Sequence, residues 1–257
     1  MYLKDKDIVV FAATGAIGSK TAHAVAREGA RVWISARDQA KLQVVADELQ
    51  AAGAEVHSSV VDATDEDAVN AYVEQVAQSA GKIDGTFNAI GGRPQALGYP
   101  APAATTPLAD FMRPMDVIVR STFLTSRVVG RVMTQQQYGS IVTLTATLSS
   151  MTAPFMTGIT AASAAIEGVT RSLAGEFGAA GVRVNCVRGN GMPETSTIQE
   201  TVAGYMALGY AIPMNLPPLG RPITVGETAA AVVFLLSDYA SGMTGQVVTV
   251  SAGAFVD

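Results

Sequence analysis

The sequence predicts an α/β protein in which helices cover both faces of a doubly wound parallel sheet of seven strands. Short apolar runs, typical of buried strands, alternate along the chain with longer amphipathic segments of helical period. A glycine-bearing turn joins the first apolar run to a helix and a second apolar run, between Ile8 and Arg37. The 257 residues are 49% hydrophobic, which suits one large core, so we expect a single domain over residues 1–257.

The first turn carries glycines at two positions, Gly15 and Gly18, and an alanine, Ala12, one motif step earlier. Glycine lets the backbone turn sharply and lets a pyrophosphate approach the amides that open the following helix. Ala12 is small but carries a β-carbon, so the fingerprint for a dinucleotide is incomplete. The alternative is a strand–helix turn that needs glycine only for packing.

The first half of the chain continues the alternation of helices and strands. Asp38 begins a helix, and Thr64 is the expected N-cap of the next one, which has acidic residues in its first turn. A loop rich in Gly, Pro and Ala, 91–106, then follows a strand end, where ligands bind in open α/β sheets. The predicted elements are helix 38–52, strand 55–61, helix 64–80 and strand 85–89.

The second half begins with a long helix that Thr106 caps and that has Pro107 at its first position. Residues 188–220 are rich in Met and Pro, and we expect a loop that acts as a lid or binding element. Its methionines, Met192, Met206 and Met214, suit an adaptable apolar cover, with plain packing as the alternative. The other predicted elements are helix 107–136, strand 139–145, helix 159–180, strand 182–187, helix 224–237 behind a capping box of Thr224 and Glu227, and strand 246–251.

Composition excludes several classes of function. The formal net charge of -5 and the lack of a run of Lys or Arg argue against nucleic acid as a partner. No apolar run is long enough to span a bilayer and no signal-peptide core is present, so we expect a cytoplasmic protein. Cys186 is the only cysteine, which excludes an internal disulfide, and the two histidines, His23 and His57, lie in different elements without a ligand cluster. We therefore expect no metal site.

Several short motifs together resemble the short-chain dehydrogenase/reductase family, in matching order and spacing over nearly the whole chain. The resemblance implies a Rossmann-like fold, a nicotinamide cofactor and a homo-oligomer, either a tetramer or a dimer. The matching residues are the glycine turn, Asp62-Ala63, Asn88-Ala89-Ile90-Gly91, Ala165 to Thr170, Arg183-Val184-Asn185, Pro218 to Arg221 and the tail from Leu235 to Gly253.

The end of the second strand chooses the cofactor in that family. An acidic residue there would bind the ribose hydroxyls of NAD, whereas this chain has Ser35-Ala36-Arg37. A guanidinium suits a 2'-phosphate, so we expect NADP(H); the alternative is that Arg37 caps the strand end or pairs with Asp38. The cofactor contacts that the resemblance implies are Gly15, Ile17, Gly18, Arg37, Asp62, Ala63, Asn88, Ala89 and Gly91.

The catalytic residues of the family, an Asn, a Ser and a Tyr-x-x-x-Lys pair, are replaced in this chain when the resemblance is followed residue by residue. The tyrosine donates a proton, and the lysine charge lowers its pKa. Replacement donors are hydroxyls near these positions, although threonines on strands usually make local hydrogen bonds and tyrosines are often simply buried. The family positions hold Ile118, Ala146, Ile159 and Ser163; the candidate replacements are Thr145, Thr147, Tyr99 and Tyr205; the expected pocket residues are Arg93, Ala146, Ile159 and Met192.

These residues indicate an NADP(H)-dependent oxidoreductase with an atypical site. Without a general acid, which contributes roughly 10²–10⁴-fold, reduction of an ordinary ketone is not expected. A hydrophobic substrate that is already activated fits better, either a cyclic imine or iminium or a conjugated acceptor. The alternatives are a catalytically silent NADP(H)-binding subunit or sensor, and a non-redox lyase or cyclase on the same fold.

Overall fold

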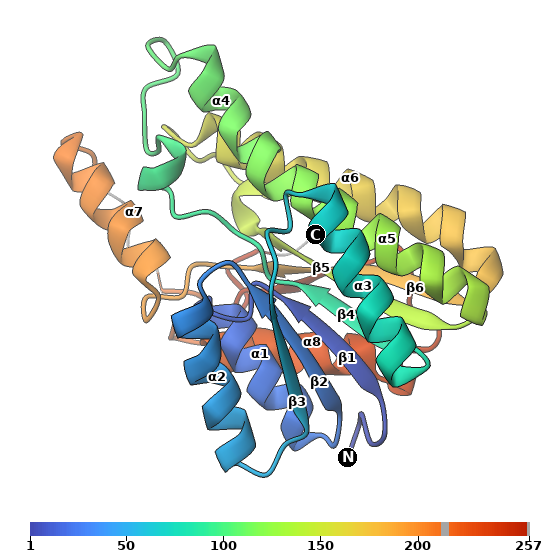
Figure 1. Cartoon of the computed structure of the whole chain (residues 1–257). Coiled ribbons are helices and arrows are strands. Elements are labelled where there is room, and N and C mark those ends of the chain that lie inside the picture. Colours follow the sequence, from blue (N-terminus) through green and yellow to red (C-terminus); the bar gives the residue numbers. More distant parts are fainter. Residues whose placement is uncertain (212–215, 256–257) are drawn as a thin grey trace.

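The computed structural model describes residues 1–211 and 216–255, and Met214 lies outside them. Within these ranges seven strands form one parallel sheet in the order β3-β2-β1-β4-β5-β6-β7 (Figure 1), which confirms the predicted fold class. The strands are β1 (Asp7–Phe11), β2 (Arg31–Ala36), β3 (Val56–Val60), β4 (Gly85–Asn88), β5 (Gly139–Ala146), β6 (Val182–Gly189) and β7 (Val247–Val250).

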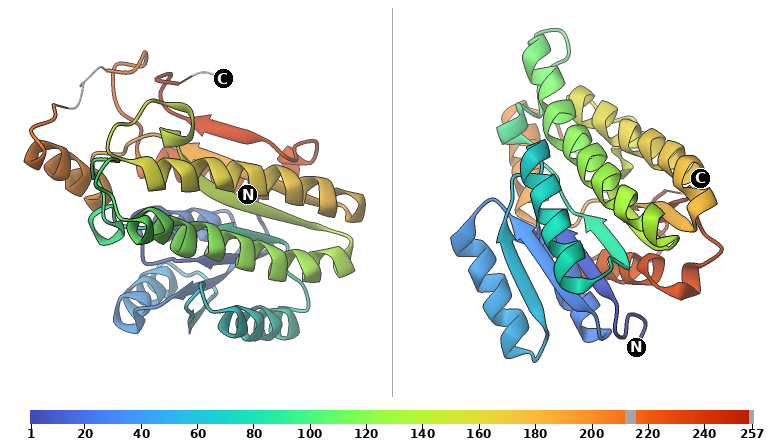
Figure 2. Two further views of the ribbon diagram at one scale, coloured as in Figure 1. Left: turned by 90° about the horizontal axis from the view of Figure 1, so that it is seen from above. Right: turned by 45° about the vertical axis from the view of Figure 1, so that its right-hand side comes forward.

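Helices cover both faces of the sheet, as the two views of Figure 2 show. One layer contains α1 (Ala16–Arg27), α2 (Gln39–Ala51) and α8 (Val225–Leu236), and the other contains α3 (Glu66–Ala80), α5 (Arg120–Gln136) and α6 (Thr157–Phe177). Two further helices, α4 (Leu108–Pro114) and α7 (Ser196–Ala207), lie beyond the sheet edge in Figure 1.

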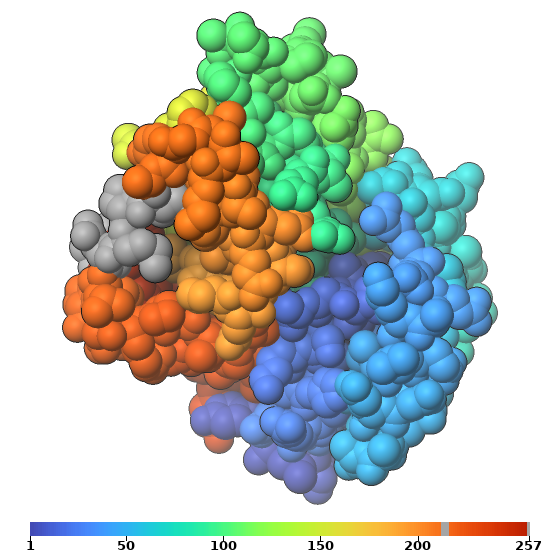
Figure 3. All heavy atoms as spheres, turned by 90° about the vertical axis from the view of Figure 1, so that its left-hand side faces the viewer, coloured from blue at the N-terminus to red at the C-terminus, as the bar shows by residue number. Residues whose placement is uncertain are grey.

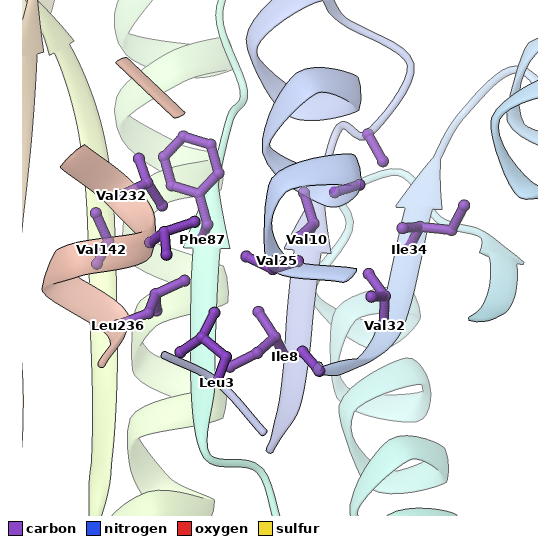
Figure 4. Packing of buried hydrophobic residues seen from close by; sticks show 14 of the residues in the cluster. Leu3, Ile8, Val10, Val25, Val32, Ile34, Phe87, Val142, Val232 and Leu236 are labelled. Carbon is purple, nitrogen blue, oxygen red and sulfur yellow. The ribbon is translucent and has the colours of Figure 1, made fainter. Parts of the chain in front are cut away.

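The core forms where the inner strands of the sheet are apolar on both faces, whereas the edge strand β3 is largely exposed. β1 is buried along its whole length, as expected for a parallel strand between two helix layers. Figure 4 shows one side, where Ile8 and Val10 of β1 pack between Val32 of β2 and Phe87 of β4. Val25 of α1 closes this side from the helix layer.

The strand order reverses at β1, which lies between β2 and β4. Phe11 at the end of β1 is in register with Ser35 on one neighbour and with Asn88 on the other. The loops after β1 and β4 leave the sheet toward opposite layers, and in open α/β sheets such a switch point is where ligands bind. Segments that follow β1, β2 and β4 therefore meet at one edge of the sheet.

Local signals explain most helix ends, with some corrections. The capping box is confirmed, since Thr224 accepts a hydrogen bond from Glu227 N and Glu227 accepts one from Thr224 N. The expected cap at Thr64 is wrong, because Asp65 is the N-cap and its side chain accepts from the amides of Asp67 and Ala68 in the first turn of α3. Thr64 instead donates its hydroxyl and its amide to Asp62, which precedes it by two residues.

The long helix predicted from 107 to 136 contains an irregular turn. Pro107 is the N-cap rather than the first helical residue, and Met115–Val119 form a π-helical turn between α4 and α5. Pro114, which cannot donate a backbone hydrogen bond, directly precedes that turn. The irregular loop predicted over 188–220 is also wrong in part, because it contains α7, capped by Thr195.

The turn between β1 and α1 has two backbone constraints. Ala12 has φ of +56°, in the left-handed region where a β-carbon is unfavourable. A β-carbon on Gly18 would lie 2.4 Å from Ala12 O, far inside van der Waals contact, so only glycine lets α1 approach the end of β1. The turn therefore tolerates an alanine at its first position at some cost, but no side chain at Gly18.

We expect Ala12→Gly to stabilise the protein by about 1 kcal/mol, because it removes the left-handed strain of an alanine. Urea unfolding followed by circular dichroism measures this change. Ala13→Gly is the matched control, since buried Ala13 lies outside that region and should lose about 0.5–1 kcal/mol. Equal destabilisation by both substitutions would contradict the strain at Ala12.

Candidate cofactor and substrate site

The turn after β1 offers a dinucleotide the open end of a helix. Gly15 is the N-cap of α1 and is exposed, and the amides that follow it have no partner within the helix. Ile17 is half-buried against the core, and Gly18 is fully buried by its contact with Ala12. A β-carbon at Gly18 would clash with the Ala12 carbonyl, so glycine there lets α1 begin close to β1, with its exposed N-cap and free amides turned outward.

A cation and a carboxylate lie close together beyond the second and third strands. Burial opposes ionisation of Asp62, but hydrogen bonds from Thr64 and the nearby charge of Arg37 outweigh it and lower the pKa of the carboxyl. Arg37 is exposed and makes no ion pair within residues 1–211 and 216–255, whereas Asp38 caps α2 and pairs with Lys41 at 3.5 Å. The alternative in which Arg37 pairs with Asp38 is therefore contradicted.

The segment after β4 is rigid where it leaves the sheet. Asn88 is buried; its Nδ2 donates to Thr125 Oγ1 at 2.7 Å and its Oδ1 accepts from Ile90 N at 2.8 Å. Ala89 N donates to Phe11 O at 3.2 Å, which ties this segment to the end of β1. Ala63 is buried after β3, and Gly91 is exposed with free space around it.

The face of α6 at the same edge is apolar and closed. Ile159 and Ser163 lie one turn apart, with 8% and 6% of their surfaces exposed, and Thr145 Oγ1 donates to the carbonyl of Ser163 at 2.9 Å. Ile118, in the π-helical turn, belongs to the same apolar cluster as Ile159, and Ala146 is half-buried at the end of β5. The structure thus brings together positions that are far apart in the sequence.

The candidate hydroxyl groups near this face all have partners. Thr145 donates to the Ser163 carbonyl, Thr147 Oγ1 donates to Asn190 Oδ1 at 3.0 Å, and Tyr205 OH donates to Pro154 O at 2.7 Å. Tyr99 OH accepts from Gly158 N at 3.0 Å. Burial, reinforced by Tyr210, raises the pKa of Tyr205. With its proton engaged by the Pro154 carbonyl and its pKa raised, the Tyr205 phenol is a poor proton donor to a substrate.

Two of the expected pocket residues lie elsewhere. Met192 packs with Ile223 and Val225 in a separate apolar cluster, and Thr228 Oγ1 donates to its sulfur at 3.6 Å. It therefore does not share the cluster of Ile159. The Arg93 side chain is 68% exposed and forms an ion pair with Glu200 of α7, so it lies at the rim of the site rather than in its apolar part.

Helix α7 lies across the end of this cluster. Tyr205 contacts Phe155 and Tyr210, with ring centroids 6.1 Å and 5.5 Å away. A β-carbon on Gly204 would lie 2.5 Å from Pro100 Cδ, so α7 packs closely on the loop after β4. Figure 3 shows α7, in orange, against the green part of that loop.

Sequence reasoning missed two polar features at this edge. Glu167 of α6 binds Arg188 of β6 through both carboxylate oxygens, at 3.0 and 3.1 Å, and Ser149 Oγ donates to the same carboxylate at 2.5 Å. Asn190, the other feature, directly follows β6 and accepts from Thr147. Polar residues at the end of an apolar strand and directly after it are the one signal that marks Arg188 and Asn190.

Neither a metal-binding cluster nor a membrane-spanning helix is found among the residues that the structure describes. Within 1–211 and 216–255, no group of three or more His, Cys, Asp or Glu side chains is arranged to hold a metal ion. Among the helices that the structure describes, none combines the length and apolar character that crossing a bilayer requires.

Comparison with known proteins gives consistent matches along the whole chain. The family model described as Enoyl-(Acyl carrier protein) reductase matches residues 12–254. A short-chain dehydrogenase of Aspergillus ruber is 35% identical, over 93% of each chain. A probable 2,4-dienoyl-CoA reductase of Bacillus subtilis is 25% identical, over 99% of this chain and 98% of its own length.

A solved structure agrees with the fold over nearly its full length. The crystal structure of NAD+-bound xylitol dehydrogenase superimposes with a TM-score of 0.92 at 27% identity, covering 98% of this chain and 100% of that one. This chain therefore shares its fold with a protein whose crystal structure contains NAD+. Sequence motifs, family model and fold agree, and the chain belongs to the short-chain dehydrogenase/reductase family.

Proposed function

We propose that this short-chain oxidoreductase uses NADP(H) and reduces an activated, hydrophobic electrophile. The observation that carries the proposal is the buried, apolar cluster of Ile118 and Ile159, together with the glycine turn after β1 that would bind a dinucleotide. Family membership supports the oxidoreductase class. NAD+ is the cofactor named for the xylitol dehydrogenase, so the choice of NADP(H) rests on Arg37.

In this proposal one set of residues binds the cofactor and another set surrounds the substrate. Arg37 and the α1 amides would hold the phosphate groups, and Asn88, fixed by Thr125, would line the ribose side. The bound cofactor would supply a hydride. Because Ile159 and Ser163 cannot donate a proton as a tyrosine–lysine pair does, the chain contributes binding, orientation and exclusion of water.

A substrate that needs little acid catalysis suits this arrangement. An iminium carbon accepts hydride without developing an oxyanion, and a conjugated acceptor spreads the charge that it gains. The family model and the Bacillus relative carry names of reductases that act on conjugated thioesters. This supports a conjugated acceptor as one of the two substrate classes, with a cyclic imine or iminium as the other.

Hydride transfer is tested with NADPH deuterated at C4, prepared separately for each face, and a pool of cyclic imines, conjugated enones and simple ketones. We expect deuterium in imine or enone products by mass spectrometry and none in ketone products. Deuterium in the ketone products would contradict the inference that the site lacks a proton donor. NADPH binding without any transfer would favour the silent subunit, and product without NADPH consumption would favour the lyase.

The double variant Ile159→Tyr/Ser163→Lys provides the matched gain-of-function test. It installs a phenol and an ammonium one turn apart on α6, and we expect ketone reduction to rise by about 10²-fold over the wild type. Initial rates of NADPH oxidation measure this. The single variant Ile159→Tyr is the control, because a phenol without the lysine keeps its ordinary pKa.

The choice of cofactor is tested with Arg37→Asp. Loss of the guanidinium and repulsion of the 2'-phosphate should weaken NADPH binding by about 10–100-fold, while NADH binding is kept or improved. Fluorescence titration of both cofactors measures the ratio. Arg131→Asp on α5 makes the same charge change away from the site. If both variants leave the ratio unchanged, Arg37 does not read the phosphate.

The chain is also proposed to form a homo-oligomer, a dimer or tetramer, through its long helices and β7. Leu108, Met112 and Phe123 are exposed apolar side chains on α4 and α5, and β7 is an edge strand with half-buried side chains. Analytical ultracentrifugation of Phe123→Glu should show dissociation or weakened association relative to the wild type. Val44→Glu, an exposed apolar position on α2, is the control that should leave the mass unchanged.

A further inference from the structure

Asn190 lies at the edge of the sheet where the neighbouring strands β5 and β6 end. Ala146 at the end of β5 is in register with Gly189 at the end of β6, and Thr147 and Asn190 directly follow these two strands. Asn190 N donates to Val250 O at 3.0 Å, which fixes its backbone to β7. The Asn190 side chain therefore starts from a rigid point beside the family serine position, now Ala146.

Thr147 orients the carboxamide of Asn190. Its hydroxyl, on a residue that is 3% exposed, donates to Asn190 Oδ1 at 3.0 Å. This bond occupies the oxygen and turns the Nδ2 group away from Thr147. Among the described residues, 1–211 and 216–255, no group accepts a hydrogen bond from Nδ2. This nitrogen is not fully buried, so a ligand could reach it. Two N–H donors are thus available.

Asn190 is half-buried, and apolar side chains pack beside the two residues that flank it. It lies between two glycines, and a β-carbon on Gly189 would be 3.6 Å from Met192 Cε, while one on Gly191 would be 3.4 Å from Ile198 Cδ1 of α7. Apolar side chains therefore close on the chain just before and just after the carboxamide. A donor in such a place is worth more than one in water, because the local dielectric constant is lower.

We propose that Asn190, oriented by Thr147, binds the carbonyl oxygen of the substrate and selects conjugated carbonyl compounds over iminium ions. This inference rests on the proposed function. N–H dipoles favour an oxygen that gains negative charge and disfavour a cationic N–H group in the same place. A carboxamide does not ionise, so it stabilises charge without donating a proton.

The chemistry balances without an acid on the protein. Reduction adds the hydride, which the cofactor would supply when bound, to the β-carbon of the C=C–C=O unit. The C=C electron pair then forms a double bond between the α-carbon and the carbonyl carbon, and the C=O π pair moves onto the oxygen to give an enolate. Asn190 Nδ2–H groups hold that oxygen. A proton from water then reaches the α-carbon, the C=O bond re-forms, and hydroxide is released to solvent. Thr147 is a positioning residue in this scheme.

The decisive experiment uses two probes, 2-cyclohexen-1-one and 3,4-dihydroisoquinoline, with four proteins: wild type, Asn190→Asp, Thr147→Val and Thr147→Ser. Asn190→Asp keeps the shape but replaces the donors by a carboxylate, and should lower kcat/KM for the enone by about 10²-fold while sparing or raising that for the iminium. Thr147→Val should show a smaller loss for the enone, and Thr147→Ser should behave as wild type.

A second readout does not depend on turnover. The carbonyl stretching frequency of ¹³C=O-labelled 2-cyclohexen-1-one, bound in the presence of NADP+, should be lower in wild type and Thr147→Ser than in Asn190→Asp and Thr147→Val. Circular dichroism and NADPH titration confirm that each variant is folded and binds cofactor.

The outcomes separate the two proposals. Equal loss on both probes, or the same carbonyl frequency in all four proteins, overturns the role of Asn190 and leaves the proposed function standing. A gain for the enone over the iminium in Asn190→Asp also overturns it, since this would mean that Oδ1 faces the substrate. Absence of label transfer to either probe overturns the proposed function, and the carbonyl frequency still decides whether Asn190 binds the oxygen.

Discussion

The close approach of α1 to the end of β1 is the constraint on which the rest of the site depends. Gly18 has no room for a β-carbon beside the Ala12 carbonyl, and this contact sets the direction in which α1 leaves the sheet. Its first amides consequently face the switch point between β1 and β4. Ala12 holds a left-handed conformation to permit this turn, so local strain is retained where a phosphate group would bind.

Helix α6 contributes residues both to the hydrophobic core and to the candidate site. Leu173 and Ala174 in its C-terminal half pack on β5 and β6, and its first two turns carry Ile159 and Ser163. Glu167, one turn further, forms a buried ion pair with Arg188 and also binds Ser149. Removing one partner of such a pair typically costs about 3–5 kcal/mol. The pair therefore fixes α6, β6 and the segment after β5 relative to one another.

The site combines an apolar cluster with polar groups at its margin. Ile118, Ile159 and Tyr205 form one cluster, and α7 closes over it through aromatic contacts. Hydrogen bonds within the protein already engage Thr145, Thr147 and Tyr205. Polar chemistry at this site then depends on groups with bonding capacity left over, and the proposed role of Asn190 rests on its carboxamide being such a group.

The sequence alone determined the layered fold, the glycine turn and most element boundaries, because buried strands, helix caps and glycine constraints are local signals. It missed α7, whose Met- and Gly-bearing sequence lacks a strong apolar period and which is stabilised by docking Tyr205 and Gly204 on loops far away in the chain. Only the tertiary structure separated Met192 from Ile159 and brought Thr147 to Asn190. Such pairs meet because parallel strands end at a common edge, and no sequence spacing encodes which side chains face each other there.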